Sequence, residues 1–172
     1  MLMDIKELHR SEKSVVTLVI DPDTGTRYVR KQLQGSHPVY AQLQTLSHPY
    51  LPNIIQVEQH PDYVTLIEEY IDGASLAEIT LPKKQVAALM EELCEVLVFL
   101  HGHGILHRDI KPSNLLLAPD GHIRLIDFDA AREEKPSADS DTRLLGTKGY
   151  APPEQYGFDC CPTCRSPILA IR

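Results

Sequence analysis

The chain has 172 residues, enough for one sizeable hydrophobic core or for two small lobes that share an interface. Its formal net charge is -7 and it has no basic cluster, which argues against a nucleic-acid-binding surface. No apolar run approaches membrane-spanning length, and the N-terminus does not resemble a signal peptide. The cytoplasm is therefore the expected compartment.

The first part of the chain is predicted to form a sheet with one helix. Residues alternate between apolar and polar around a turn signal, which is typical of a hairpin, and a helical spacing follows at Val39, Leu43 and Leu46. The expected elements are a strand over 14–20, a turn over 21–25, a strand over 26–33, a helix over 38–46, and strands over 53–60 and 63–70.

After a short linker at 71–73, the apolar spacing predicts a long helix over 81–100, and Pro82 suits its first turn. Cys94 falls within this apolar pattern, so its thiol is expected to be buried. The remaining expectations are two short strands over 114–117 and 123–126 and a mobile polar loop over 132–145.

The most informative stretch combines acidic, basic and amide side chains at fixed intervals. It consists of two runs, His107-Arg108-Asp109-Ile110-Lys111-Pro112-Ser113-Asn114 and Leu125-Ile126-Asp127-Phe128-Asp129. Together they supply a candidate base, a lysine and two oxygen ligands of the kind that Mg²⁺ prefers. Phosphoryl transfer requires such a set, because its catalysis is mostly positioning and neutralisation of phosphate charge.

These runs resemble the catalytic loop and the metal-binding loop of eukaryotic-type (Hanks-type) protein kinases, and the chain is similar to the bacterial serine/threonine kinases. The segment Gly146-Thr147-Lys148-Gly149-Tyr150-Ala151-Pro152-Pro153-Glu154 resembles the end of that family's activation segment. The resemblance implies an α+β, protein-kinase-like two-lobed fold, with an N-lobe of sheet and one helix over 1–70. A partial, mainly helical C-lobe would cover 71–172, truncated because a whole kinase domain is longer.

The resemblance further implies transfer of the γ-phosphate of ATP to a serine or threonine hydroxyl of a protein. Asp109 would be the catalytic base and Lys111 would neutralise charge on the transferred phosphoryl group. Asn114 and Asp127 would hold Mg²⁺, with Mn²⁺ as a possible substitute, and Asn114 would in this way contribute to binding the cofactor.

Two further residues have implied roles around the base. Arg108 resembles the family's arginine that pairs with a phosphorylated residue, for which its planar fork is suited, although an ordinary surface partner is the alternative. Thr147 would hydrogen-bond near Asp109 and Lys111 and shape the acceptor site. The candidate phosphorylation sites are Ser137, Ser140 and Thr142.

The nucleotide site is implied mainly by the run Tyr28-Val29-Arg30-Lys31. Lys31 would hold the α- and β-phosphates of ATP. Val16 and Val29 would cover one face of the adenine, and Leu116 the other. The run Glu69-Tyr70-Ile71 would be the hinge, with backbone groups of Glu69 and Ile71 bonding to the adenine edge.

Three features depart from the family's pattern. The run His9-Arg10-Ser11-Glu12-Lys13-Ser14-Val15-Val16 has no glycine where the family has a glycine-rich phosphate loop, whose backbone takes positive φ. Val39 stands in place of the helix glutamate that pairs with the lysine, so Lys31 is expected to lack its usual partner. Asp129 replaces a glycine, and its carboxylate would either join the metal site or repel the nucleotide.

These departures keep two alternatives open. Besides the active kinase that the resemblance implies, the alternatives are a pseudokinase, which binds nucleotide or a partner without turnover, and a truncated fragment that does not fold stably. A separate question concerns Cys160, Cys161 and Cys164. Cys161 and Cys164 have the spacing of half a zinc site or of a redox pair, and an uncommitted tail is the favoured interpretation.

Overall fold

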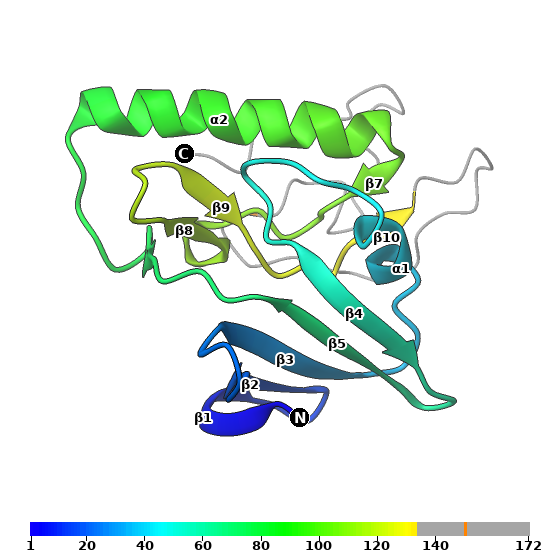
Figure 1. The fold of residues 1–172 in the computed structure, drawn as a ribbon. Helices are drawn as coiled ribbons and strands as arrows, with labels where there is room; N and C mark the ends of the chain where they lie inside the picture. The colour runs from blue at the N-terminus through cyan, green and yellow to red at the C-terminus, as the bar shows by residue number, and fades with distance from the viewer. Residues whose placement is uncertain (134–149, 151–172) are drawn as a thin grey trace. The chain divides into compact units, whose positions relative to one another are not determined.

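The computed structural model describes residues 1–133 and Tyr150. The chain divides into two compact units, Met1–Asp72 and Gly73–Arg172 (Figure 1). The first unit is an antiparallel sheet with one short helix, and the described part of the second contains one long helix with short strands. No helix among the described residues is long and apolar enough to cross a membrane.

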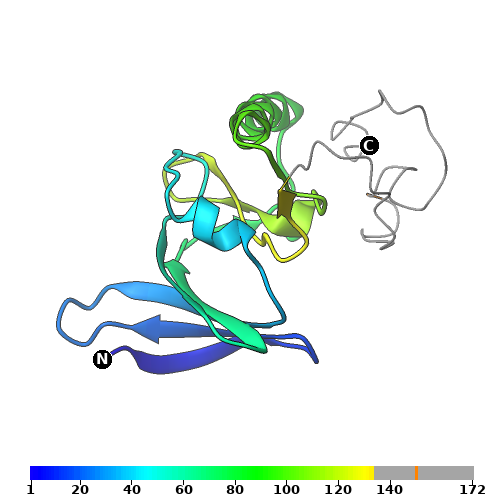
Figure 2. The ribbon, with the colours of Figure 1, turned by 90° about the vertical axis from the view of Figure 1, so that its right-hand side faces the viewer.

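The first unit is built on a five-stranded sheet in the order β1-β2-β3-β5-β4, in which every neighbouring pair is antiparallel. Figure 2 shows that this sheet twists strongly from β1 to β4. The predicted strands and turns are confirmed to within two residues at their ends. The elements are β1 (Met3–Arg10), β2 (Ser14–Ile20), β3 (Arg27–Gln34), α1 (Val39–Leu43), β4 (Ile54–Gln59) and β5 (Tyr63–Glu69).

The first strand, β1, was missing from the sequence prediction. All of its residues are exposed, and its pairing with β2 shifts register twice, between Asp4 and Lys6 and between Glu7 and His9. An edge strand with no buried face has no need for alternating apolar residues, and irregular pairing breaks the period of two. The usual signal for a strand is therefore absent.

The helix α1 is shorter than predicted. It buries Val39 and Leu43, as the apolar spacing indicated, and also Tyr40, whereas Leu46, the third position of that spacing, lies beyond the helix and is half-buried. Beyond Gln44 the chain continues in single turns, in which Thr45 N–H donates to Gln42 O and Leu46 N–H donates to Leu43 O. These bonds join residues three apart, as in a 3₁₀ turn, which is typical of the C-terminal end of a helix.

The second unit is organised by α2 (Lys83–Gly102), which packs against β7 (Ile105–Leu106) and β9 (Ile123–Leu125). A three-stranded sheet has the order β6-β8-β9, and β7 pairs with β10. The remaining elements are β6 (Ala74–Ser75), the 3₁₀ turn η1 (Pro112–Asn114), β8 (Leu115–Leu117) and β10 (Arg132–Glu133). The predicted long helix and the two predicted strands are confirmed, whereas β6, β7 and β10 are too short to show a period.

Side chains join α2 to the β8–β9 hairpin. Glu92 accepts hydrogen bonds from the backbone N–H of Ile123 at 3.0 Å and from the ring of His122 at 2.8 Å. In the hairpin turn, bonds from the Arg124 side chain and the His122 backbone lower the pKa of Asp120. The hairpin that carries one side of the candidate site is thus fixed to the helix.

The expectation that Cys94 is buried is wrong, because this side chain is exposed. The buried stripe of α2 comprises Leu89, Leu93, Val96, Leu97 and Leu100. Cys94 lies beside this stripe, in the row that continues to Val98, which is 72% exposed. For a residue at the edge of the buried face of a helix, position around the helix predicts burial better than residue type does.

We expect Leu93→Ala to lower the free energy of unfolding by about 2–5 kcal/mol, because Leu93 is fully buried and its loss leaves a cavity. Val98→Ala, on the exposed side of the same helix, should change it by no more than about 0.5 kcal/mol. Urea denaturation followed by circular dichroism measures both. Equal effects of the two substitutions would contradict the assigned core face.

Candidate active site

The two motif runs lie on adjacent loops of the second unit. The first run follows β7 and ends in η1, and the second follows β9 and leads to β10. Pairing of β8 with β9 and of β7 with β10 holds the two loops at both ends. Between them, the N–H of Ile126 donates to the carbonyl of Asn114 at 3.0 Å. Residues far apart in sequence are thereby brought into one backbone framework.

His107 connects the two loops through its ring. It is 2% exposed, its Nε2 lies 3.1 Å from Ile126 O, and its Nδ1 accepts the N–H of Asp109 at 3.3 Å. This bonding pattern fits a neutral ring with its proton on Nε2. The ring also contacts Phe128 edge-on, with a centroid distance of 4.6 Å. No role for His107 was predicted from the sequence.

The candidate base, Asp109, is held by both polar residues predicted beside it. Its Oδ2 lies 2.7 Å from Lys111 Nζ and accepts a hydrogen bond from Asn114 Nδ2 at 3.1 Å. Asn114 Nδ2 also donates to the Asp109 carbonyl at 2.8 Å. The structure therefore brings Asp109, Lys111 and Asn114 together, and it fixes the orientation of the carboxylate.

The pair predicted to hold Mg²⁺ offers the ligand types that a hard divalent ion prefers, an amide oxygen and a carboxylate. Asn114 is buried and uses its amide nitrogen on Asp109, which turns its side-chain oxygen away from that contact. Asp127 adds an anionic oxygen from the neighbouring loop. No group of three or more His, Cys, Asp or Glu side chains with metal-site geometry occurs among the described residues.

Strained backbone occurs at two positions in these loops. Among the described non-glycine residues, only Arg108 (φ 68°) and Asp127 (φ 67°) lie in the left-handed region. Such conformations cost on the order of 1–3 kcal/mol and tend to occur at functional sites. Asp129 is not among these positions, so the aspartate in place of the family's glycine adds no strain of this kind. Its N–H faces Asp127 Oδ1 at 3.4 Å.

In the first unit, Lys31 has an ion-pair partner that the sequence analysis missed. Its Nζ lies 2.9 Å from Glu68 Oε1 on the neighbouring strand β5, and the side chains are 8% and 7% exposed. The expected absence of a helix glutamate is correct, since α1 reads Val-Tyr-Ala-Gln-Leu. Glu68 follows the apolar pair Leu66-Ile67 in β5, and a buried charge is rare unless it is paired.

The residues predicted to cover the adenine are distributed over both units. Val16 is the register partner of Lys31, and Val29 is the partner of Leu18, so Val16, Val29 and Lys31 share one face of the sheet. Leu116 lies on β8 in the second unit, half-buried and opposite Arg124.

The predicted hinge residues Glu69 and Ile71 lie at and just after the end of β5. The Glu69 carboxylate accepts two hydrogen bonds from Asn53, through its backbone N–H at 3.1 Å and its amide at 2.8 Å. A surface hollow nearby is lined by Tyr28, Glu69 and Tyr70 among others. Since Tyr28 and Glu69 are register partners, they lie on the face opposite to Val29 and Lys31, so this hollow is separate from the predicted nucleotide face.

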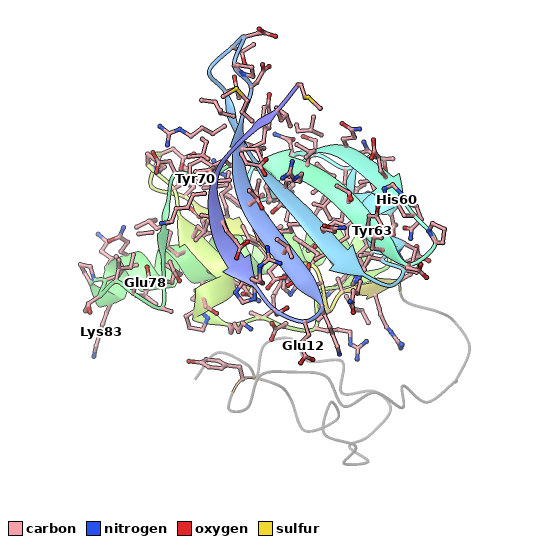
Figure 3. The ribbon with its side chains drawn as sticks, turned by 90° about the horizontal axis from the view of Figure 1, so that it is seen from below. Glu12, His60, Tyr63, Tyr70, Glu78 and Lys83 are labelled. Atoms are coloured by element: carbon pink, nitrogen blue, oxygen red, sulfur yellow. The ribbon has the colours of Figure 1, made fainter. Side chains whose placement is uncertain are left out.

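The turn between β1 and β2, where the family's pattern has glycines, is closed by serine in this chain. Ser11 Oγ accepts the N–H of Ser14 at 3.0 Å and contacts the Ser14 hydroxyl, and Ser11 N–H donates to Ser14 O. No residue from 9 to 16 has positive φ. Hydroxyl-to-backbone bonds of this kind stabilise turns without glycine. Figure 3 shows Glu12 at the tip of this turn and His60 beside Tyr63 at the β4–β5 turn.

Several predicted residues lie outside the described part of the chain. They are Thr147, the candidate phosphorylation sites Ser137, Ser140 and Thr142, and the cysteines Cys160, Cys161 and Cys164. The same holds for most of the stretch predicted to be a mobile loop, of which Arg132–Glu133 form β10.

Comparison with known proteins agrees with this geometry. Residues 5–159 match the protein kinase domain family. Serine/threonine-protein kinase 36 of Pongo abelii is 33% identical over 81% of this chain and 11% of its own length. Serine/threonine-protein kinase 17A of Oryctolagus cuniculus is 28% identical over 90% of this chain and 44% of its own. Serine/threonine-protein kinase pkn2 of Myxococcus xanthus is 32% identical over 66% and 15%. The chain thus spans less than half of each of these relatives.

We expect His107→Phe to lower the free energy of unfolding by about 1–3 kcal/mol, because it leaves the Ile126 carbonyl and the Asp109 N–H without their ring partner. Phenylalanine keeps the edge contact with Phe128, so the change isolates the hydrogen bonds. Chemical denaturation gives the value. His9→Phe on the exposed strand β1 is the control, and an equally small effect of both substitutions would argue against the bridging role.

Proposed function

Because this chain belongs to the protein kinase family, we propose that it transfers the γ-phosphate of ATP to a serine or threonine hydroxyl of a protein substrate. The observation that carries the proposal is the Asp109 carboxylate, held by Lys111 and Asn114 on a loop bonded to the one that bears Asp127. The names of the relatives, which are serine/threonine-protein kinases, support the class of acceptor.

In this proposal Asp109 accepts the hydrogen bond of the acceptor hydroxyl and orients its oxygen toward the γ-phosphate. It takes the hydroxyl proton as the new O–P bond forms, while the bond from the γ-phosphorus to the β–γ bridging oxygen breaks and ADP leaves. Lys111, fixed at 2.7 Å from the Asp109 carboxylate, places a positive charge next to the reacting groups. That charge stabilises the transferred phosphoryl group, whose oxygens carry negative charge in the transition state.

Asn114 and Asp127 would hold Mg²⁺ through an amide oxygen and a carboxylate, and Mn²⁺ could replace it because it accepts the same ligands. The ion would neutralise phosphate charge. Lys31 would bind the α- and β-phosphates, and Val16, Val29 and Leu116 would contact the adenine. Backbone groups of Glu69 and Ile71 would bond to the adenine edge. In this assignment residues 1–70 act as the N-lobe and 71–172 as a partial C-lobe.

Two proposed roles concern control of the acceptor site. Arg108, directly before the base, would bind a phosphorylated residue bidentately, with Ser137, Ser140 and Thr142 as candidates. Its left-handed backbone turns the chain sharply at this point. Thr147 would hydrogen-bond near Asp109 and Lys111.

We expect Mg·ATP at millimolar concentration to raise the thermal unfolding midpoint, because a ligand that binds only the native state stabilises it. Asp127→Asn should reduce this shift strongly, as should chelation of the metal by EDTA. Asp23→Asn, in the exposed turn before β3, is the control and should leave the shift unchanged. If the wild-type midpoint does not move, the chain does not bind ATP and the proposed function is wrong.

We expect Asp109→Asn to slow phosphate transfer by about 10²–10⁴-fold, because the amide cannot accept the hydroxyl proton. Transfer of radiolabelled phosphate to a generic protein substrate measures the rate, and the Mg·ATP shift of the unfolding midpoint should persist in the variant. Equal incorporation by both proteins would remove Asp109 from the role of base. A wild-type chain that binds Mg·ATP but transfers no label would instead be a pseudokinase.

A further inference from the structure

We propose that Glu68 is the residue that positions Lys31 for the nucleotide phosphates, so that a strand replaces the helix as the source of the orienting carboxylate. This inference rests on the proposed function, because it concerns how the same site binds ATP. The family's pattern pairs the strand lysine with a helix glutamate. In this chain the pair is formed within the sheet.

The two side chains meet because of strand register. Lys31 on β3 lies opposite Leu66 on β5, and Glu68 lies opposite Val29. Lys31 and Glu68 are therefore diagonal neighbours on one face of the sheet, a separation that long side chains can bridge. Their charged atoms are 2.9 Å apart, which is the length of a charge-assisted hydrogen bond.

The helix cannot supply this carboxylate. α1 contains no acidic residue, and Val39, which stands at the position of the family's glutamate, is buried among apolar side chains. No aspartate or glutamate occurs anywhere from residue 24 to residue 57. The carboxylate that pairs with Lys31 within the first unit is instead that of Glu68 on β5.

Burial makes a purely structural role for this pair hard to explain. Removing two charges from water costs several kcal/mol per ion, so a buried pair is often no better for stability than well-packed apolar residues. The same face of β5 carries Val64 and Leu66, which are fully buried and need no partner. If position 68 only had to fill the core, an apolar residue there would do so without the cost of burying a charge.

The chemistry of the ammonium group is compatible with both partners. Lysine has three N–H donors, so a bond to Glu68 does not prevent donation to phosphate oxygens. The carboxylate holds Nζ on the face that carries Val16 and Val29, the residues proposed to contact the adenine. Fixing the charge there before ATP binds reduces the ordering that binding must accomplish.

A regulatory difference follows from this arrangement. A lysine that depends on a helix glutamate is correctly placed only when the helix is correctly placed, and family members are controlled in this way. Lys31 and Glu68 lie on strands joined by a continuous antiparallel ladder from Tyr28 to Gln34. Their pairing is complete once the sheet is folded, so a shift of α1 does not break it.

The test compares Glu68→Gln with Glu58→Gln, which removes an exposed carboxylate from the neighbouring strand β4. We expect Glu68→Gln to raise the Kd and the KM for Mg·ATP by about tenfold, the usual effect of losing one charge-assisted contact, with a smaller change in kcat. Glu58→Gln should leave all three values unchanged. A merely structural role would lower the unfolding midpoint without altering the Kd of the folded protein, and that result would overturn the inference.

The exchanged variant Lys31→Glu/Glu68→Lys provides a second measurement. It restores an ion pair, so its unfolding midpoint should exceed that of Glu68→Lys alone, whereas its affinity for Mg·ATP should remain at least about tenfold below wild type because the ammonium is misplaced. Affinity equal to wild type would overturn the inference. If Glu68→Gln does not fold, Glu68→Asp, which keeps the charge but shortens its reach, takes its place with the same expected loss.

Different results refute the proposed function and the role of Glu68. A wild-type chain that does not bind Mg·ATP refutes the proposed function and this inference with it. A wild-type chain that binds Mg·ATP, together with a Glu68→Gln variant that binds equally well, overturns the inference alone.

Discussion

The candidate site depends on one buried ring. His107 donates to the carbonyl of Ile126 and accepts from the N–H of Asp109, so its ring joins the loop that carries Asp109 to the loop that carries Asp127. Two backbone groups that would be costly to bury unpaired are satisfied at once. The strained conformations at Arg108 and Asp127 persist because this contact and the flanking strand pairs leave the loops no alternative.

Each unit holds one charged side chain in a fixed position, but the partners that hold it come from different distances along the sequence. In the second unit, the Asp109 carboxylate is held by Lys111 and Asn114, which follow it closely in the sequence. In the first, the charge of Lys31 is fixed by a residue thirty-seven positions away, which only sheet register brings near. Partners that are close in the sequence form a recognisable motif, whereas partners that are brought together only by strand register do not.

This contrast explains what could be predicted from sequence. The strands with one buried face, the long helix and the cluster around Asp109 all follow from local periodicity or fixed spacing, and all were predicted. The partner of Lys31 was missed because a diagonal contact requires the register of β3 against β5. The absence of the family's glycines from the turn at Ser11 is plain in the sequence, but the hydroxyl-to-backbone bonds that close this turn follow from no local period and were not predicted. Cys94 was predicted to be buried but is exposed, because it lies one residue beyond Leu93 and just outside the buried stripe of α2.

Strand β1 has a consequence for the kinetics of the first unit. It is bonded along one edge only, it is exposed throughout, and its ladder is interrupted twice. Such a segment opens at a much lower free energy than the buried strands β3 and β5, and its amide hydrogens should exchange first. The serine-built turn at its end moves with it, because Ser11 is the residue directly after the strand. We therefore expect this edge and its turn to open locally while the lysine–glutamate pair on β3 and β5 stays intact.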